Sequence, residues 1–222
     1  MDFTDVPFII KSIPLYVEAM KVTLVIGLLG IVLSLLLGLL CSIITYYQVK
    51  GLKRIVAIYI ELSRNTPLLI QLFFLYYGLP QLGIKLESTT CAIIGLTFLG
   101  GSYMAEAFRS GLEAVSKTQI EAGLSIGLTN PQLIRYVILP QAIAVAIPGI
   151  GANAIFLLKE TSVFSAVALA DLMFVAKDLI GMYYKTNEAL LVLVIAYLII
   201  LLPMSLGITL LERRIRYAGF GR

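Results

Sequence analysis

The sequence contains no histidine, only two cysteines and few charged residues, and each shortage narrows the possible functions. Without histidine the chain lacks the commonest metal ligand and the usual general base, which argues against a membrane-embedded enzyme. Cys41 and Cys91 lie inside apolar runs, where a thiol usually acts as a small hydrophobe and not in a disulfide. Charged residues make up 14% of the chain and hydrophobic residues 59%, whereas about a quarter of a soluble domain is charged. The composition therefore predicts an all-α, polytopic membrane protein without catalytic or metal-binding residues.

Five apolar stretches are long enough to cross a membrane, since about 20 helical residues span a bilayer core of about 30 Å. The expected spans are 22–44, 55–79, 90–108, 134–158 and 189–211, within a single transmembrane domain that covers residues 1–222. The second span is interrupted at Asn65-Thr66-Pro67, because proline lacks an N–H and disfavours a helical residue before it. A broken helix at membrane depth is tolerated where it lines a cavity, and an ordinary proline kink is the alternative.

Two further segments are predicted to lie at the outer face without crossing. Residues 162–184 contain Asp171, Lys177 and Asp178, a pattern typical of an amphipathic helix packed on or partly into that face. The apolar residues that recur there at helical spacing are Leu172, Met173, Ala176, Leu179 and Ile180. A sixth span over this segment would also place the terminal arginines outside. The shorter amphipathic segment 8–20 is expected to lie along the outer surface before the first span.

Basic residues predict the orientation of the spans. Those on one side are Lys50, Lys53, Arg54, Arg109, Lys117, Arg135, Arg213, Arg214, Arg216 and Arg222; those on the other are Lys11, Lys21, Lys85, Lys159, Lys177 and Lys185. The richer set belongs in the cytoplasm by the positive-inside rule. The N-terminus is then outside and the C-terminus inside, which requires an odd number of spans. Topology also explains the basic pI, so no nucleic acid partner is expected.

The loop between the third and fourth predicted spans has the start and stop signals of a short helix. Ser116 and Gln119 have the S-x-x-Q form of a capping box, and Gly127 supplies a left-handed C-terminal position. Asn130-Pro131 is expected to start the next helix as N-cap and first helical residue. We therefore expect a helix over 117–127, although a surface helix that merely links two spans would show the same signals. The residues that share one side of it are Glu121, Ala122 and Ser125.

The residues of this loop resemble the signature of ABC-type importer permeases. Glu121-Ala122, Gly127 and Val137-Ile138-Leu139-Pro140 are similar to its pattern of E-A-A, three residues, G, nine residues and I-x-L-P. Gly123 stands where the second alanine is usual, at a cost of about 1 kcal/mol in helix propensity, and Val137 replaces isoleucine. The segments that resemble polar amino acid permeases (histidine, glutamine, arginine and cystine permease-like) are Arg64–Leu69 with Gln71-Leu72, Tyr103 with Ala105-Glu106 and Arg109, and Asn153 with Leu158–Ser162.

The resemblance implies a type I ABC importer permease in a bacterial plasma membrane, importing a polar amino acid. It implies that residues 117–127 form the coupling helix, which docks in a cleft of a cytoplasmic ATPase through Glu121, Ala122, Ser125 and Gly127. The implied partners are two ATPase subunits that bind ATP and Mg²⁺, a second permease subunit (identical or related), an external solute-binding protein and membrane lipid. No cofactor is expected in this chain, which has no phosphate-cradling G-x-x-x-x-G-K-[ST] motif and so does not itself hydrolyse ATP.

Polar residues within the spans are candidate functional residues. Glu61 with Arg64, and Glu106 with Arg109, are three apart and are expected to form structural or gating ion pairs near cytoplasmic helix ends. The candidates for a substrate pathway are Thr66, Asn153, Glu160, Thr161 and Ser162. The Asn153 amide either bonds to a neighbouring helix or faces the pathway.

The residue after Asn153 bears on the substrate. The family often has an acidic residue there, which would favour a cationic substrate, but this chain has Ala154. A neutral, cystine-like or acidic amino acid is therefore expected over arginine, lysine or histidine.

The alternative function is an ATP-independent secondary transporter or channel subunit. The sequence has no obvious inverted repeat and no mid-membrane acidic site suited to proton or sodium coupling. This alternative would also leave the coupling-helix signature unexplained.

Overall fold

The computed structural model describes residues 5–220, with side chains through residue 215. Arg222 therefore lies outside the described residues. The α-helices are α1 (Val6–Tyr46), α2 (Leu52–Arg64), α3 (Leu68–Phe73), α4 (Ser88–Glu113), α5 (Lys117–Ser125), α6 (Asn130–Leu133), α7 (Leu139–Glu160), α8 (Leu172–Tyr183) and α9 (Thr186–Phe220). Short π- or 3-10-helical segments are Phe74–Gly78, Leu79–Leu82, Ile134–Ile138 and Thr161–Val167. The described chain is thus all-helical, as the sequence predicted.

Within the described residues, four helical stretches are long and apolar enough to cross a membrane. They are Val6–Tyr46, Ser88–Glu113, Asn130–Val167 and Thr186–Ile215. These stretches cover the predicted spans 22–44, 90–108, 134–158 and 189–211.

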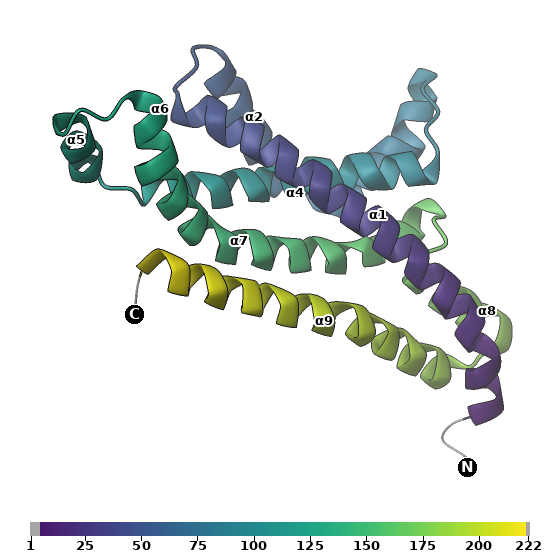
Figure 1. The fold of residues 1–222 in the computed structure, drawn as a ribbon. Helices are drawn as coiled ribbons and strands as arrows, with labels where there is room; N and C mark the ends of the chain where they lie inside the picture. Colours follow the sequence, from purple (N-terminus) through teal and green to yellow (C-terminus); the bar gives the residue numbers. More distant parts are fainter. Residues whose placement is uncertain (1–4, 221–222) are drawn as a thin grey trace.

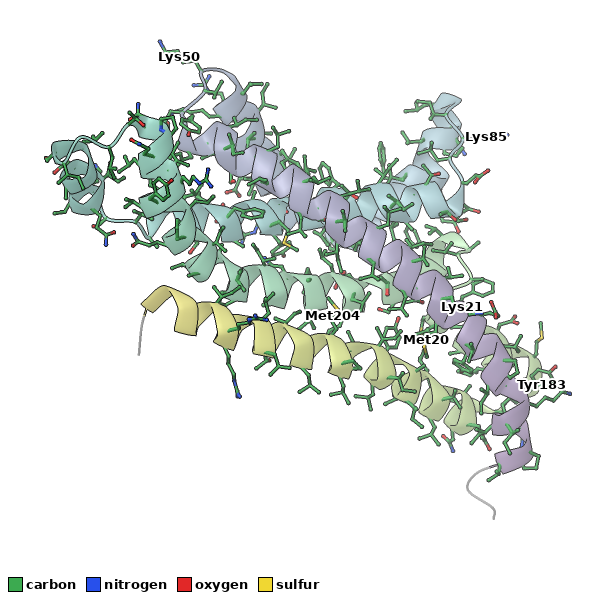
Figure 2. The ribbon with its side chains drawn as sticks, in the orientation of Figure 1. Met20, Lys21, Lys50, Lys85, Tyr183 and Met204 are labelled. Carbon is green, nitrogen blue, oxygen red and sulfur yellow. The ribbon has the colours of Figure 1, made fainter. Side chains whose placement is uncertain are left out.

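The predicted span 55–79 is divided into two helices. α2 ends at Arg64, and α3 begins at Leu68 after the break at Asn65-Thr66-Pro67. The apolar helical stretch Leu68–Leu82 is shorter than the four long ones. Lys50, just before α2, and Lys85, just after this stretch, lie on different sides of the molecule (Figure 2).

The prediction of a separate surface segment over 8–20 is wrong. These residues form the first part of α1, a continuous helix of 41 residues that tolerates Pro14. Tyr16 is only 2% exposed, and its hydroxyl donates to the Ala189 carbonyl of α9 (2.7 Å). The Phe8 ring packs edge-on against Tyr183 of α8, with 5.5 Å between ring centroids. This burial against α8 and α9 holds the segment in line with the rest of α1.

Of the segment 162–184, residues 162–167 end the long stretch Asn130–Val167, and the remainder belongs to none of the four stretches. The segment divides into a 3-10 segment and α8, whose 12 residues cover only about 18 Å. The Asp171 side chain caps α8 by accepting a hydrogen bond from the Phe174 N–H (2.8 Å). One face of α8 is buried, through Leu172, Ala176 and Leu179. The predicted amphipathic character is therefore present in a shorter helix.

The main buried core is built from α1, α3, α4, α7, α8 and α9, and α4 packs most extensively against α1 and α7. Gly38 of α1 allows close approach to α4, because a Cβ added there would lie 2.5 Å from the Met104 Cβ and 2.7 Å from the Ala105 nitrogen. Small residues at such crossings let helices pack closely within membranes. α5 and the end of α9 lie at one end of the molecule, and α8 and the start of α1 lie at the other (Figure 1). We call these the α5 end and the α8 end.

Candidate functional site

The predicted loop helix is present as α5, from Lys117 to Ser125. The Ser116 hydroxyl oxygen accepts a hydrogen bond from the Gln119 N–H (3.3 Å), which confirms Ser116 as the N-cap. The reciprocal bond from the Ser116 N–H to the Gln119 side chain, which would complete the predicted capping box, is not found among the described residues. Gly127 has a φ of +85°, so the predicted left-handed position after the helix is also confirmed. The helix itself ends two residues before Gly127.

The predicted cap of the following helix is displaced by one residue. Thr129 caps α6, and its N–H donates to the Gln132 side chain (2.9 Å). Asn130 is consequently the first helical residue and Pro131 the second. Gln132 at the third helical position completes a capping box with Thr129, and this pairing decides where the helix starts.

Between Glu121 and Gly127, the residues at positions of the permease signature or predicted to contact the ATPase are exposed, except for one buried glycine. Glu121, Ala122, Ser125 and Gly127 are exposed. Gly123 is buried, and a Cβ added there would lie 2.5 Å from the Leu133 Cδ1 atom. The glycine in place of the usual alanine therefore fits the close packing of α5 on α6.

Two exposed apolar side chains of this region were missed by sequence reasoning. Ile126 is 80% exposed and Leu124 is 48% exposed on the isolated chain. They lie beside the exposed Glu121 and Ser125, so apolar as well as polar side chains of this loop are open to a partner. The sequence offered no signal for either residue, because an apolar side chain in a loop helix can equally be buried against the spans.

The charged residues of α2 and α4 form a connected network. Glu106 accepts from Arg109 (Nη2–Oε2 2.7 Å), which confirms that predicted pair. Arg109 also contacts Glu113 one turn further along α4 (Nη1–Oε2 2.8 Å). Glu113 was missed, although its i, i+4 spacing from Arg109 was a visible signal.

The predicted pair between Glu61 and Arg64 is wrong. Arg64, the last residue of α2, turns toward α4, where its guanidinium lies 5.2 Å from the ring centroid of Tyr103. Its Nη1 atom is 3.6 Å from Glu106 Oε2. Glu61 instead accepts a hydrogen bond from the Asn65 amide (3.2 Å). Stacking over an aromatic ring favours arginine here, and no spacing within α2 could reveal it.

A pocket of about 260 Å³ lies beside the break between α2 and α3. The lining side chains that matter for its chemistry are Arg64, Thr66, Tyr103, Phe156 and Glu160. They come from α2, the break, α4 and α7, so the pocket exists only in the folded chain. It combines one cationic and one anionic side chain with two aromatic rings, whose centroids are 5.2 Å apart. The sequence marks Tyr103 only through its resemblance to the permease family, and Phe156 was missed by sequence reasoning.

The remaining pathway candidates lie outside this lining. Asn153 donates to the Tyr103 carbonyl (3.1 Å), so its amide joins α7 to α4. Thr161 is fully buried, and its hydroxyl donates to the Leu158 carbonyl (2.7 Å). Ser162 is half-buried at the start of the 3-10 segment. Ala154 is only 8% exposed, so the absence of a carboxylate at this position says little about the pocket.

Gln71 has a structural part in forming the pocket that the sequence did not reveal. Its side-chain amide, on α3, donates to the carbonyls of Thr66 within the break (2.9 Å) and of Ser63 in α2 (3.2 Å). These bonds satisfy acceptors that the interrupted helix leaves free. The only signal was its place in the segment that resembles amino acid permeases.

Comparison with known proteins agrees with this architecture. Residues 30–217 match the family described as "Binding-protein-dependent transport system inner membrane component". The chain is 36% identical over 216 residues to the probable amino-acid permease protein YxeN of Bacillus subtilis, covering 96% of each. It is 32% identical over 207 residues to the glutamine transport system permease protein GlnP of Escherichia coli K12, covering 92% of this chain and 94% of GlnP.

A solved structure supports the same assignment. The fold matches a crystal structure of an amino acid ABC transporter with histidines at a TM-score of 0.88 and 33% identity, covering 95% of this chain and 99% of that one. The predicted resemblance to ABC-type amino acid importer permeases is therefore confirmed, and an ATP-independent transporter is set aside. The chain belongs to the family of inner membrane components of binding-protein-dependent transport systems, as a multi-pass permease that works with a separate ATPase and a binding protein.

Proposed function

We propose that this permease translocates a neutral polar amino acid of the glutamine type, which binds in the pocket between Arg64 and Glu160. The observation that carries the proposal is a guanidinium and a carboxylate lining one pocket of about 260 Å³. A zwitterionic amino acid presents the opposite charges. Arg64 can hold its α-carboxylate in a bidentate manner, and Glu160 can accept from its ammonium group.

The two charges of the pocket also favour a neutral side chain. Once Arg64 and Glu160 engage the backbone groups of the substrate, the lining described here offers no further charge to a side chain. Tyr103 and Phe156 provide apolar surface, and Thr66 provides a hydroxyl. Small-molecule sites commonly combine apolar walls with a few polar groups that fix orientation. The names of the glutamine permeases among the relatives point the same way.

Five crossings of the membrane, with the N-terminus outside and the C-terminus in the cytoplasm, complete the proposed topology. The fifth crossing is the divided stretch of α2, α3 and the turns up to Leu82, flanked by Lys50 and Lys85 (Figure 2). Irregular backbone at membrane depth is tolerated where it is buried in protein or lines a cavity. Thr66 and Pro67 of the break line the pocket between Arg64 and Glu160, which we call the Arg64 pocket. The break therefore meets that condition.

The α5 end is proposed to dock on the ATPase through Glu121, Ala122, Ser125 and Gly127, with Leu124 and Ile126 as apolar contacts. The permease would act as a pair, with an identical or related chain, beside two ATPase subunits. ATP-driven closure of the ATPase pair would move α5, and α4 and α7 would carry that movement to the pocket. Alternating access then requires two discrete packings of the membrane helices.

The docking proposal is tested by purifying the tagged chain from its native membrane with Glu121→Lys and Glu18→Lys variants. Glu18 is an exposed acid near the α8 end, paired with Lys21 (2.6 Å), and serves as the matched control. We expect the ATPase to co-purify with the wild type and the Glu18 variant but not with the Glu121 variant. Equal recovery of the ATPase with all three would refute docking through this face.

The substrate proposal is tested by uptake into vesicles that contain the permease, its ATPase and its binding protein. We expect labelled L-glutamine to accumulate with ATP, and Arg64→Ala and Glu160→Gln to reduce the rate at least tenfold while the complex stays assembled. The control is Lys159→Gln, next to Glu160 but exposed and outside the pocket lining. Unchanged uptake in both pocket variants would refute the site.

A further inference from the structure

The ion-pair network of α4 begins beside the pocket and ends beside α5. Glu106, Arg109 and Glu113 are spaced i, i+3 and i+7 along α4, a rise of about 10 Å. Glu113 is the last residue of α4, and Ser116 caps α5. Arg64 joins the network at its other end, where it also lines the pocket. A change at Arg64 can therefore reach the α5 end through contacts along one helix.

Arg64 is the loosest member of this network. Its Nη1 atom lies 3.6 Å from Glu106 Oε2, whereas Arg109 reaches the same oxygen at 2.7 Å. A separation of 3.6 Å is too long for a hydrogen bond. Among the described residues, no hydrogen bond from the Arg64 guanidinium is found. Its N–H donors are therefore available to a carboxylate in the pocket.

Glu106 does not depend on Arg64 for a partner. Both of its carboxylate oxygens are engaged by Arg109, through Nε (3.3 Å) and Nη2 (2.7 Å). Glu106 lines a different pocket, of about 170 Å³, with Glu61 and Lys53, and is not in the lining of the Arg64 pocket. Arg64 can turn away from Glu106 without leaving that carboxylate unpaired.

We propose that Glu106 and the substrate carboxylate compete for Arg64, so that Glu106 sets the affinity of the pocket and senses its occupation. In the empty pocket Arg64 is held toward Glu106. With substrate bound, its guanidinium turns to the α-carboxylate, and Glu106 remains with Arg109 alone. Glu106 is thus a positioning residue, since it acts on the substrate only through Arg64. The inference rests on the proposed function of the pocket.

The competition predicts a gain of affinity on removing the charge of Glu106. Partly exposed ion pairs contribute about 0.2–1 kcal/mol, so Glu106→Gln should tighten substrate binding about 1.4- to fivefold. The matched control is Glu113→Gln, which also removes a partner of Arg109 but does not contact Arg64. It should leave the affinity unchanged. Glu106→Asp keeps the charge but withdraws it by one methylene, and should give an intermediate shift.

The test is equilibrium binding of L-glutamine and L-glutaminamide to the purified complex of permease and ATPase, without binding protein. The amide lacks the α-carboxylate, so we expect it to bind the wild type weakly and to gain nothing from Glu106→Gln. A merely structural effect of the substitution would shift both ligands alike. Elution volume and melting temperature establish that each variant is folded. If Glu106→Gln does not fold, Glu106→Asp takes its place in the comparison.

The outcomes separate the two proposals. If the wild type does not bind L-glutamine, or does not distinguish it from the amide, the proposed function of the pocket is wrong and the competition falls with it. If the wild type prefers L-glutamine, but Glu106→Gln and Glu106→Asp leave its affinity unchanged, the pocket stands and the competition is overturned. An equal gain in Glu113→Gln would overturn it as well.

Discussion

A single amide side chain, that of Gln71, bridges the break between α2 and α3. Replacing it with leucine would leave the Ser63 and Thr66 carbonyls without their shared donor. An unsatisfied buried polar group costs about 1–3 kcal/mol, so we expect Gln71→Leu to lower the melting temperature of the detergent-purified chain by several degrees. Gln81→Leu is the control, because Gln81 is exposed in the short 3-10 segment Leu79–Leu82. Equal melting temperatures for both variants would contradict a stabilising role for Gln71.

A second residue-scale prediction concerns Asp171, which is fully buried at the start of α8. Burial raises the pKa of its carboxyl to about 7, from about 4 in an unfolded chain. Between these values the folded state retains a proton that the unfolded state has lost, so stability falls as pH rises from about 4 to 7. Asp171→Asn keeps a capping oxygen for the Phe174 N–H but cannot ionise.

We therefore expect the wild type to lose free energy of unfolding, on the order of 2 kcal/mol, between pH 4.5 and 7.5, and Asp171→Asn to lose much less. Thermal melting in detergent across this range measures the difference. Asp178→Asn, at an exposed position of the same helix, should retain the wild-type dependence. The same pH dependence in all three proteins would exclude Asp171 as its source.

The start and stop signals of α5 were predictable from near neighbours, whereas the cap of α6 and the pairing of Glu61 were not, nor were roles that depend on tertiary packing. Ser116 and Gly127 frame α5 as expected, because caps and left-handed positions are set within one turn of chain. The partner of Arg64 could not be predicted, since α2 and α4 are separated by the α2–α3 break and a loop. Phe156 was missed for the same reason, as an apolar residue in an apolar run becomes a pocket wall only through tertiary packing.

At the scale of elements, the crossing of α1 and α4 depends on Gly38. A Cβ there would approach the Ala105 backbone nitrogen to 2.7 Å, and backbone cannot move aside as a side-chain tip can. Gly38→Val should separate the two helices and lower stability by about 1–3 kcal/mol or more. Gly207→Val on α9 is the matched control, because a Cβ added there meets nothing within 4 Å. Melting of the isolated chain in detergent would show the contrast, and similar losses in both variants would argue against close packing as the cause.

Long apolar runs predicted where helices lie but not where they begin. The run 22–44 is readable because it carries no charge, whereas residues 8–20 contain Lys11 and Glu18, and their sequence alone predicts a separate surface segment. They continue α1 because Tyr16 and Phe8 are covered by α9 and α8. Those covering elements follow more than 140 residues later, and their positions could not be inferred from local periodicity.

At the scale of the whole molecule, the basic side chains distinguish the α5 end from the α8 end. The α5 end, which contains both α5 and the end of α9 (Figure 1), is proposed to face the cytoplasm. Because α7 and α9 both cross in the proposed topology, α5 and the end of α9 share one side only if α8, which lies between α7 and α9, does not cross the membrane. If α8 crossed, the residues on its two sides would be exposed to different compartments. The positions that test this are Lys50 before α2, Lys85 after the divided stretch, Ala170 before α8 and Tyr184 after it, all of which are exposed.

Single cysteines at these four positions can be probed in a background with Cys41 and Cys91, both buried, replaced by alanine. We expect a membrane-impermeant maleimide to label positions 85, 170 and 184 from outside spheroplasts, and position 50 only after permeabilisation. Labelling of 170 without 184 would make α8 a crossing helix. Labelling of position 50 without position 85 would show that the orientation is the inverse of the proposed one. α5 would then lie outside, where no ATPase could dock. Because Lys50 and Lys85 flank only the divided stretch, opposite labelling of these two also requires that this stretch crosses the bilayer despite its break.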